Sequence, residues 1–295
     1  MEELQFVDWQ WEDYQSLRAN PEKKKQQINL LYATGLIETV DGIEYTFVPT
    51  KKMLELEKNI QNLYEKIHVT DTEIQLCNEV FYTSKIEGAH TTLVHTQKIH
   101  EGVETDGSFS ETMVANGFQA TKFLNLYPDT FTEEILLKVW KILTDGACNN
   151  IDIIGVKYRD GNVQVGNHMG LNPELLEQAM QNWIIYYNSK NLQQYPFIKA
   201  ALLHFSFEFI HPFCDGNGRC GRLLMNNFLI QHGYEKVKAV SFSRSIEKNR
   251  ALYDAEFAVS DNVYTDCTSF IEYMLTQMQD AFLDILDGID FTKEI

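Results

Sequence analysis

The sequence predicts an all-α fold, mainly helical, with a small β-hairpin. Three observations favour this class. Apolar residues recur at helical spacing over most of the chain after residue 50. Several of these segments begin at a capping residue or a proline and end at a glycine. Two Asp-Gly pairs, at 41–42 and 160–161, stand between short β-prone runs and predict two-residue hairpin turns.

Composition sets the outer limits on function. The 295 residues are 44% hydrophobic, enough to bury one large core or two small ones. No run of about 18 uncharged apolar residues is present, so we expect no membrane span. The acidic N-terminus does not resemble a signal peptide, and five cysteines without a CxxC pair indicate reduced thiols. We therefore expect a cytoplasmic protein.

The formal net charge is −17, which argues against a nucleic-acid partner, because non-specific binding of that kind needs a basic surface. An acidic surface mainly favours solubility. If the protein handles an anionic ligand, its positive groups must be concentrated locally.

Residues 1–50 combine helix and strand signals, and the pattern becomes helical after them. A short helix is expected from Pro21 to Tyr32, with Gly35 after its end, followed by the first hairpin at 39–45. Apolar residues from Leu54 to Ile67 then follow helical spacing. The run 70–73 opens another helix, which a glycine at position 88 is well placed to end.

Residues 157–165 interrupt the later helices and carry the second hairpin signal, which predicts a type I′ turn at Asp160-Gly161. Helices are expected on both sides of it. They begin at or near Ser110, Thr132, Asn172, Pro196, Arg219, Ser245 and Cys267.

The segment HPFCDGNGRCGR, residues 211–222, concentrates polar and flexible groups directly after an apolar run. Residues 216–221 spell G-x-G-x-x-G, which alone is a weak signal. A dinucleotide-binding fingerprint would need an acid at the end of the next strand, and none follows residues 237–242. A Walker A loop would need Lys-Ser/Thr after the last glycine, where this chain has Arg222-Leu223. Both readings fail.

The physical chemistry of these twelve residues still indicates a phosphate site. A glycine turn that leads into a helix near Arg219 presents backbone N–H groups and the positive end of the helix dipole to an anion. Arg219 and Arg222 share one helix face, and guanidinium groups suit phosphate oxygens. Asp215 can hold a divalent cation, and His211 can act as a general base near neutral pH.

The segment resembles the signature of the Fic family, H-x-F-x-(D/E)-G-N-G-R-x-x-R, and every defined position is filled. The resemblance continues into residues 204–205 and 223–225. It implies a helical Fic core at about 110–245. The remaining chain divides into an N-terminal segment, a helical region and C-terminal helices packed on the core, at 1–50, 51–109 and 246–295 respectively.

The resemblance implies a protein adenylyltransferase that moves AMP from ATP to a Ser, Thr or Tyr hydroxyl of a target protein and releases pyrophosphate. In that reading His211 deprotonates the hydroxyl and Asp215 positions Mg²⁺. Arg219 meets the β-phosphate and Arg222 the γ-phosphate. The phosphate-binding set implied is Gly216, Asn217, Gly218, Arg219 and Arg222. The glycine at 218 favours nucleotidyl transfer over the phosphorylation of the related Doc branch.

A second motif, TSKIEG at 83–88, resembles the family's inhibitory motif, (S/T)-x-x-x-E-(G/N), placed N-terminal to the core. Its defined residues are Thr83, Glu87 and Gly88. The resemblance implies that Glu87 pairs with Arg222 and denies the γ-phosphate its arginine, which makes the enzyme self-inhibited.

The second predicted hairpin would be the family's target-docking flap, whose strand edge pairs with an extended target segment. Its residues are Tyr158, Arg159, Asp160, Gly161, Asn162 and Val163.

Alternatives stay open at this point. The partners expected are ATP and a protein substrate that includes the chain itself, and a homo-oligomer is not excluded. The same site fits removal of AMP or transfer of another nucleotide or phosphate group. A non-catalytic nucleotide sensor is the third reading, although a pure binder has no need of His211.

Overall fold

The structure is a computed structural model, and it describes residues 4–9, 32–37, 44–68, 72–103, 105–127, 130–148, 157–165, 168–260 and 266–288. The first half contains β1 (Tyr32–Ile37), β2 (Glu44–Phe47), α3 (Lys51–Lys66), α4 (Thr72–Ile86), α5 (Leu93–His100), α6 (Phe109–Asn125) and α7 (Glu133–Thr144). The second half contains β3 (Gln164–Val165), β4 (His168–Met169), η2 (Pro173–Leu175), α8 (Leu176–Asn188), α9 (Pro196–Ile210), α10 (Asn217–Gln231), η3 (Glu235–Ala239), α11 (Phe242–Lys248), α12 (Arg250–Ser260) and α13 (Thr268–Leu286). The predicted helical class is confirmed.

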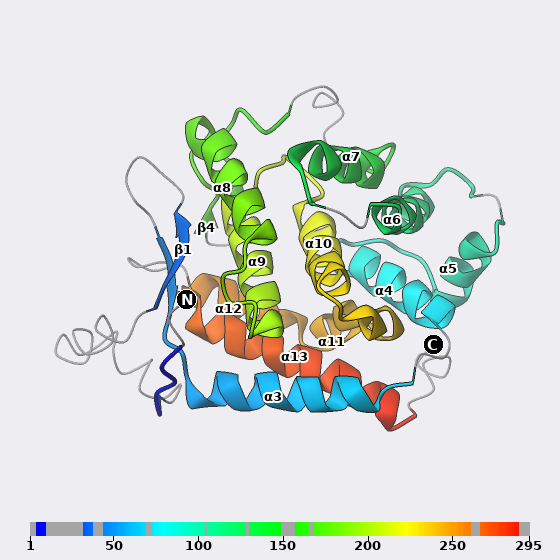
Figure 1. Ribbon diagram of the computed structural model, residues 1–295. Helices are drawn as coiled ribbons and strands as arrows, with labels where there is room; N and C mark the ends of the chain where they lie inside the picture. Colours follow the sequence, from blue (N-terminus) through cyan, green and yellow to red (C-terminus); the bar gives the residue numbers. More distant parts are fainter. Residues whose placement is uncertain are drawn as a thin grey trace.

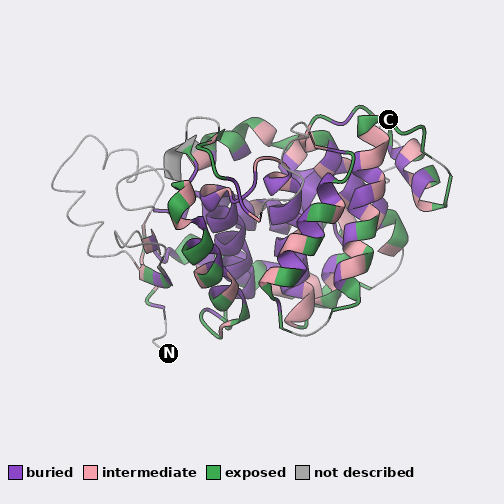
Figure 2. Cartoon of the chain, turned by 90° about the horizontal axis from the view of Figure 1, so that it is seen from above, coloured by how far each residue is buried: buried purple, intermediate pink, exposed green. Residues whose placement is uncertain are grey.

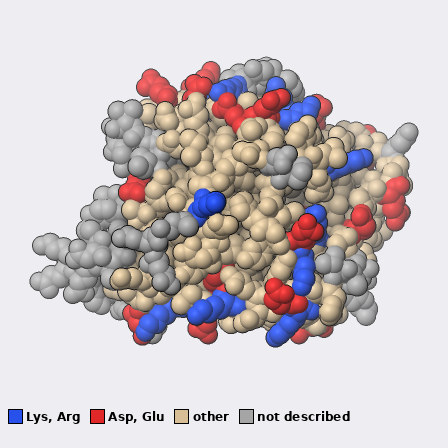
Figure 3. Space-filling view, viewed as in Figure 1, with Lys and Arg blue, Asp and Glu red and all other residues tan. Residues whose placement is uncertain are grey.

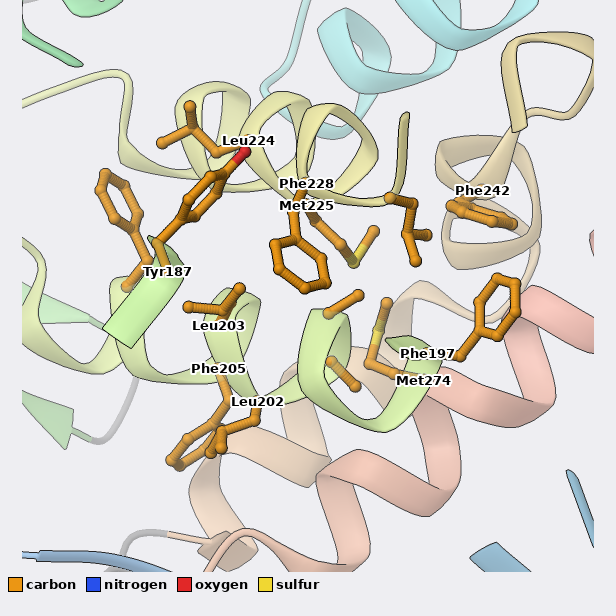
Figure 4. Packing of buried hydrophobic residues seen from close by; sticks show 14 of the residues in the cluster. Tyr187, Phe197, Leu202, Leu203, Phe205, Leu224, Met225, Phe228, Phe242 and Met274 are labelled. Carbon is orange, nitrogen blue, oxygen red and sulfur yellow. The ribbon is translucent and has the colours of Figure 1, made fainter. Parts of the chain in front are cut away.

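Helices α9 and α10 stand side by side at the centre (Figure 1). Helix α9 is apolar on nearly all sides, which is typical of a helix enclosed by others, and almost every residue in it is buried. Figure 4 shows side chains from α8, α9 and α10, among them Tyr187, Leu203 and Phe228, filling the space between these helices. The residues that precede and follow the 211–216 loop are therefore held in the core.

The other helices form layers around this pair. Helices α3 and α13 lie against each other and run along one end of α9 (Figure 1). Helices α4, α6 and α7 lie on the far side of α10. Seen from above, buried residues gather on the inner faces of these helices and exposed residues on the outer ones (Figure 2).

Several helix ends lie where local chemistry predicts them. The Thr132 hydroxyl accepts from the backbone N–H of Ile135 at the start of α7. Pro196 occupies the first position of α9. Gly88 and Gly233 end α4 and α10 with positive φ values of 84° and 92°.

The start of α9 also receives a cap from a distant helix. The buried carboxylate of Glu57 in α3 accepts from the backbone N–H groups of Ile198 at 2.9 Å and Phe197 at 3.4 Å. Burial raises the pKa of Glu57 to about 7.

The first hairpin is confirmed, since β1 pairs with β2 in an antiparallel sheet. The Asp-Gly turn predicted at 41–42 lies outside the described residues. Most of the helix predicted at Pro21–Tyr32 does too, but Tyr32 itself begins β1. Gly35 has a φ of 74° and lies within the irregular part of that strand, so its prediction as a helix stop is wrong.

The second hairpin is present but displaced. Strands β3 and β4 pair at 164–165 and 168–169, beyond the predicted centre. The type I′ turn at Asp160-Gly161 is wrong, because such a turn needs positive φ at both central residues and Gly161 has none. The Arg159 side chain instead donates to the Gly161 carbonyl at 2.7 Å and closes the turn locally.

Two other helical predictions need correction. The helix expected from Ser245 to Phe257 is two helices, α11 and α12, separated at Asn249, whose side chain donates to Gln277 of α13 at 2.9 Å. Helix α5 was not predicted.

In the described part of the chain, no helix combines the length and apolar character that crossing a membrane requires. On the face in Figure 3, charged side chains of both signs lie mainly around the rim.

Candidate active site

The loop that joins α9 to α10 begins at His211, whose backbone is in the left-handed region at φ 50° and ψ 63°. This conformation is uncommon for a residue with a side chain and needs support from its surroundings. Arg159 supplies it. Its Nε donates to the His211 carbonyl at 2.6 Å, and its backbone N–H donates to the Pro212 carbonyl at 3.0 Å.

The His211 imidazole is 15% exposed, and its Nδ1 lies 3.2 Å from the Glu208 carbonyl oxygen. A carbonyl oxygen only accepts hydrogen bonds, so this contact favours the tautomer with the proton on Nδ1. Nε2 then carries the lone pair. A neutral imidazole in this tautomer can accept a proton through Nε2.

Aromatic packing and an amide clamp hold the middle of the loop. The Phe213 ring is stacked on Trp140, with centroids 4.5 Å apart and planes at 7°. The Asn217 amide accepts from the Phe213 N–H at 2.9 Å and donates to its carbonyl at 2.7 Å. Trp140 Nε1 donates to the Asp215 carbonyl at 3.0 Å. The loop is thus fixed to α7 as well as to α10.

Two glycines allow the start of α10 to face an open pocket. Gly216 precedes the helix with φ 81°, and a Cβ there would meet the Thr144 side chain at 2.7 Å. A Cβ on Gly218 would lie 2.3 Å from Glu87 Oε1. The first N–H groups of a helix have no intrahelical acceptor, so this turn has the character of an anion site.

Arg219 is tied to the core. Its side chain is 2% exposed, and Nη1 donates to the carbonyls of Leu143 at 2.9 Å and Ala147 at 3.1 Å. Nη2 lies 3.2 Å from Asp215 Oδ1. In this arrangement Arg219 connects the loop to the end of α7, and a contact with a β-phosphate stays a prediction.

Arg222 is tied to the end of α4. Its side chain is 1% exposed, Nε donates to Thr83 Oγ1 at 2.9 Å, and Nη2 donates to Glu87 Oε1 at 2.6 Å. Burial alone would raise the pKa of Glu87, but the adjacent Arg222 guanidinium brings it below its ordinary value. The ion pair expected between the two motifs is present, and its effect on ATP binding stays a prediction.

The two motifs enclose a cavity of about 170 Å³. Its lining includes His211 at the start of the loop and Arg222 in the second turn of α10, with Glu87 between α4 and α10. The remaining lining residues are Glu208, Phe209, Gly218, Arg250, Tyr253, Asp254 and Phe257. A candidate base, a candidate phosphate-binding arginine and the acid that occupies it therefore share one small space.

The loop and both arginines lie in a segment that is similar to a known family. Residues 130–229 match the Fic/DOC family. Beyond this segment the chain is compared with whole relatives. It is 29% identical over 229 residues to a protein adenylyltransferase Fic of Aedes aegypti, a match that covers 76% of this chain and 45% of the relative. A protein of the same name from Culex quinquefasciatus is 27% identical over 235 residues, with the same coverage. This chain spans less than half the length of these relatives.

Solved Fic structures share the fold. A Fic family protein from Desulfovibrio desulfuricans G20 superposes with a TM-score of 0.71 at 23% identity, covering 81% of this chain and 75% of that one. Fic-1 (aa134–508) from C. elegans gives 0.65 at 19% identity, covering 82% and 74%. The helical Fic fold expected from residues 211–222 is confirmed.

Asp215 is the carboxylate nearest to the start of α10 in the Fic motif. Its Oδ1 accepts from the Gly216 N–H at 2.6 Å as well as facing Arg219. The described residues contain no group of three or more His, Cys, Asp or Glu that could hold a metal. A role for Asp215 in holding Mg²⁺ stays a prediction.

The predicted docking flap is partly buried and partly exposed. Tyr158 and Arg159 are buried, and the Tyr158 hydroxyl donates to Glu133 Oε1 at 2.7 Å. The next three residues, 160–162, are exposed and Val163 is half-buried. Only the exposed part can meet another chain without rearrangement.

Sequence reasoning missed two supporting groups. Arg250 donates to the Ile86 carbonyl at 3.2 Å, next to the inhibitory motif, and pairs with Asp254 at 3.0 Å. Glu208 lines the site cavity, and burial raises its pKa to about 8. Its position three residues before His211, on the buried side of α9, was the available signal for Glu208. No sequence signal marked Arg250.

His204 of α9 lies in the core beside the site. It is buried, and its Nε2 lies 2.9 Å from the Tyr253 hydroxyl. Burial lowers the pKa of His204 to about 3, so its imidazole stays neutral.

Proposed function

We propose that this chain is a self-inhibited protein adenylyltransferase. It moves AMP from ATP to a Ser, Thr or Tyr hydroxyl of a target protein and releases pyrophosphate. The observation that carries the proposal is the shared cavity, which is lined by His211 of the loop and Arg222 of α10 and in which Glu87 holds Arg222. The names of the relatives support the same activity.

The chemistry follows from the residues around the cavity. His211 Nε2 takes the proton of the target hydroxyl, whose oxygen attacks the α-phosphorus as the bond to pyrophosphate breaks. The first N–H groups of α10 and the two arginines stabilise the charge on the phosphates. Catalysis then rests on positioning and on electrostatic stabilisation.

Asp215 would hold Mg²⁺, which when bound neutralises part of the phosphate charge. Arg219 pairs with the same carboxylate at 3.2 Å and thereby holds Asp215 in its place on the loop. We place the Fic core at 110–245 and the inhibitory region at 51–109, in a cytoplasmic protein.

Inhibition depends on competition for Arg222. With Thr83 and Glu87 as its partners, the arginine is not available for a γ-phosphate. Helix α4 and the nucleotide then exclude each other, and the chain is active only when Glu87 leaves.

Target docking uses the exposed residues 160–162 and the neighbouring β3–β4 hairpin. The backbone of a short sheet edge can pair with an extended segment of the target and place its hydroxyl near His211. The target proposed is a protein, and the chain itself is one such substrate.

The test uses Glu87→Gly with α-labelled and γ-labelled ATP in separate reactions. Label transferred to protein from the α position alone supports adenylylation, and His211→Ala in the same background abolishes it. Transfer from the γ position alone means a kinase. Binding of ATP with no transfer from either position means a nucleotide sensor.

Removal of AMP is a second candidate, favoured by the position of Glu87 in the same cavity as His211. A carboxylate there can orient a water molecule toward a phosphodiester. Modified Glu87→Gly protein, mixed with unlabelled wild-type chain, would lose its label as AMP in that case.

A further inference from the structure

Glu208 lies on α9 three residues before His211 and lines the same cavity. Its side chain is 8% exposed, and its Oε2 lies 3.8 Å from His211 Nδ1. The backbone carbonyl oxygen of Glu208 lies 3.2 Å from the same ring nitrogen. Two oxygens of one residue therefore face Nδ1, the nitrogen across the ring from the Nε2 that takes the proton in the proposed reaction.

The other carboxyl oxygen of Glu208 does not serve the fold through a hydrogen bond. Oε1 is buried and has no hydrogen-bond partner among the described residues. Buried carboxyl oxygens that hold a fold together are normally hydrogen-bonded, as both oxygens of Glu57 are at the start of the same helix. The nearest group that the Glu208 side chain can serve is thus the ring of His211.

Gly221 of α10 makes room for this carboxyl. A Cβ at position 221 would lie 2.5 Å from Glu208 Oε1. Because the residue is a glycine, the carboxyl packs directly against the backbone of α10 and stays beside the ring of His211. The two helices that carry the loop therefore also hold an acid next to its candidate base.

Charged and titratable groups pack around Glu208 or line its cavity. They come from α9, the loop, α10, the segment after α4, and α12, and they are His204, His211, Cys220, Arg222, Glu87, Arg250, Tyr253 and Asp254. Burial raises the pKa of Glu208 to about 8, and the Arg222 guanidinium opposes that rise. The carboxyl therefore carries a proton at neutral pH and loses it just above that range.

We propose that Glu208 is a positioning residue for His211, whose ionised carboxylate accepts a hydrogen bond from Nδ1–H while Nε2 takes the proton of the target hydroxyl. Nδ1 keeps its own proton, so a single proton moves, from the hydroxyl oxygen to Nε2. The positive charge that forms on the ring is then paired with the carboxylate.

The distance between the two groups suits this role. At 3.8 Å, Oε2 and Nδ1 are about 1 Å farther apart than in a charge-assisted hydrogen bond, and catalytic contacts of this kind tighten as charge forms. The inference rests on the proposed transfer of AMP, because without it His211 has no proton to take.

The pH profile of AMP transfer tests the role in the Glu87→Gly background. The transfer rate should rise with pH in two steps, because the coupled pair of His211 and Glu208 loses two protons. Glu208→Gln cannot ionise, so it should keep one step and reach a plateau about tenfold lower. A Glu208→Gln variant with the profile of its parent would overturn the inference.

Glu256→Gln is the matched control. Glu256 of α12 is also a buried glutamate, and burial raises its pKa to about 7, but it is not part of the cavity lining. This substitution should leave both steps of the profile in place. Equal changes in the two variants would mean that any buried acid alters the rate, which contradicts a specific role of Glu208.

Nitrogen NMR of the histidine rings measures the contact without turnover. The chain has eight histidines, so the His211 signal is assigned by its absence in His211→Asn. The ring should respond to two ionisations in wild type and to one in Glu208→Gln. A wild-type ring that titrates in a single step would refute the contact, even where Glu208→Gln does not fold.

The two measurements separate this inference from the proposed function. Absence of AMP transfer by Glu87→Gly would count against the proposed function, whatever the ring titration shows. Transfer that is unchanged by Glu208→Gln, together with a ring that titrates in one step, would count against Glu208 alone.

Discussion

Arg219 and Arg222 lie three residues apart on α10 and are both buried, but their partners differ in kind. Arg219 is held by backbone carbonyls at the end of α7 and by Asp215 of its own loop. Arg222 is held by Thr83 of α4 and by Glu87, which directly follows that helix, in the region carrying the inhibitory motif. Carbonyls of the core cannot leave without unfolding, whereas side chains at a helix end can. The first arginine is part of the scaffold and the second is available for a switch.

The largest expected effect is on stability. Arg219→Met leaves the Leu143 and Ala147 carbonyls and Asp215 without their donor, which should cost about 4 kcal/mol in the free energy of unfolding. The double variant Arg222→Met, Glu87→Gln removes both members of its pair and should cost about 1 kcal/mol. Denaturant unfolding gives both values. Equal losses in the free energy of unfolding would show that the contacts of Arg222 with α4 are as important for folding as those of Arg219 with the core. The two arginines would then not differ in role.

The next effect is the pH dependence of folding stability that comes from Glu208, which lines the same cavity as Arg222. Burial raises the pKa of Glu208 to about 8, so between its ordinary value of 4.5 and 8 the folded protein holds a proton that the unfolded chain releases. Folding stability from this group therefore falls as the pH rises through that range. Relative to Glu208→Gln, which cannot ionise, wild type should lose roughly 3 kcal/mol between pH 5 and 8.5. Parallel stability curves would show that Glu208 is ionised throughout.

A smaller effect tests the contacts of Arg222 with α4. Thr83→Val keeps the shape of the side chain and removes the acceptor of the Arg222 Nε–H bond. Loss of such a bond costs about 1.5 kcal/mol, so ATP affinity should rise about tenfold, less than in Glu87→Gly. Equilibrium binding of labelled ATP measures the change, with Thr276→Val as the control, because Thr276 is a half-buried helical threonine whose hydroxyl bonds only within α13. A variant that binds ATP like wild type would leave Glu87 as the sole inhibitory contact.

The smallest effect concerns Arg250. Its bond to the Ile86 carbonyl supports the end of α4, but the side chain is well exposed and also pairs with Asp254. Such contacts are worth under about 1 kcal/mol, so Arg250→Ala should raise ATP affinity about threefold. Lys248→Ala, which removes an exposed pair with Asp284, is the control. A decrease in ATP affinity would mean that Arg250 binds the nucleotide itself.

The residues that carry the candidate chemistry were predictable from local sequence, and their supports were not. Residues 211–222 contain the base, the glycines and both arginines within one loop and one helical turn, so their proximity follows from chain connectivity. Arg159 was predicted as a docking residue, yet it lies buried under His211, 52 positions along the chain. Its hydrogen bonds form only when the segment that carries Arg159 packs against the end of α9 and the loop that follows it. No local sequence pattern encodes that packing.

The sequence by itself determined the helical class, many of the helix ends and the composition of the phosphate loop. These features depend on capping, on glycine at positive φ and on spacings within a few residues. The resemblance to the family's inhibitory motif also implied the pair of Arg222 with Glu87. Only the tertiary structure decided that Arg219 turns to the core, because the Leu143 and Ala147 carbonyls come from a chain segment more than 70 residues away. It also decided the cavity that His211, Arg222 and Glu87 share. Such a space is what remains after several separate elements have packed, and no single segment specifies it.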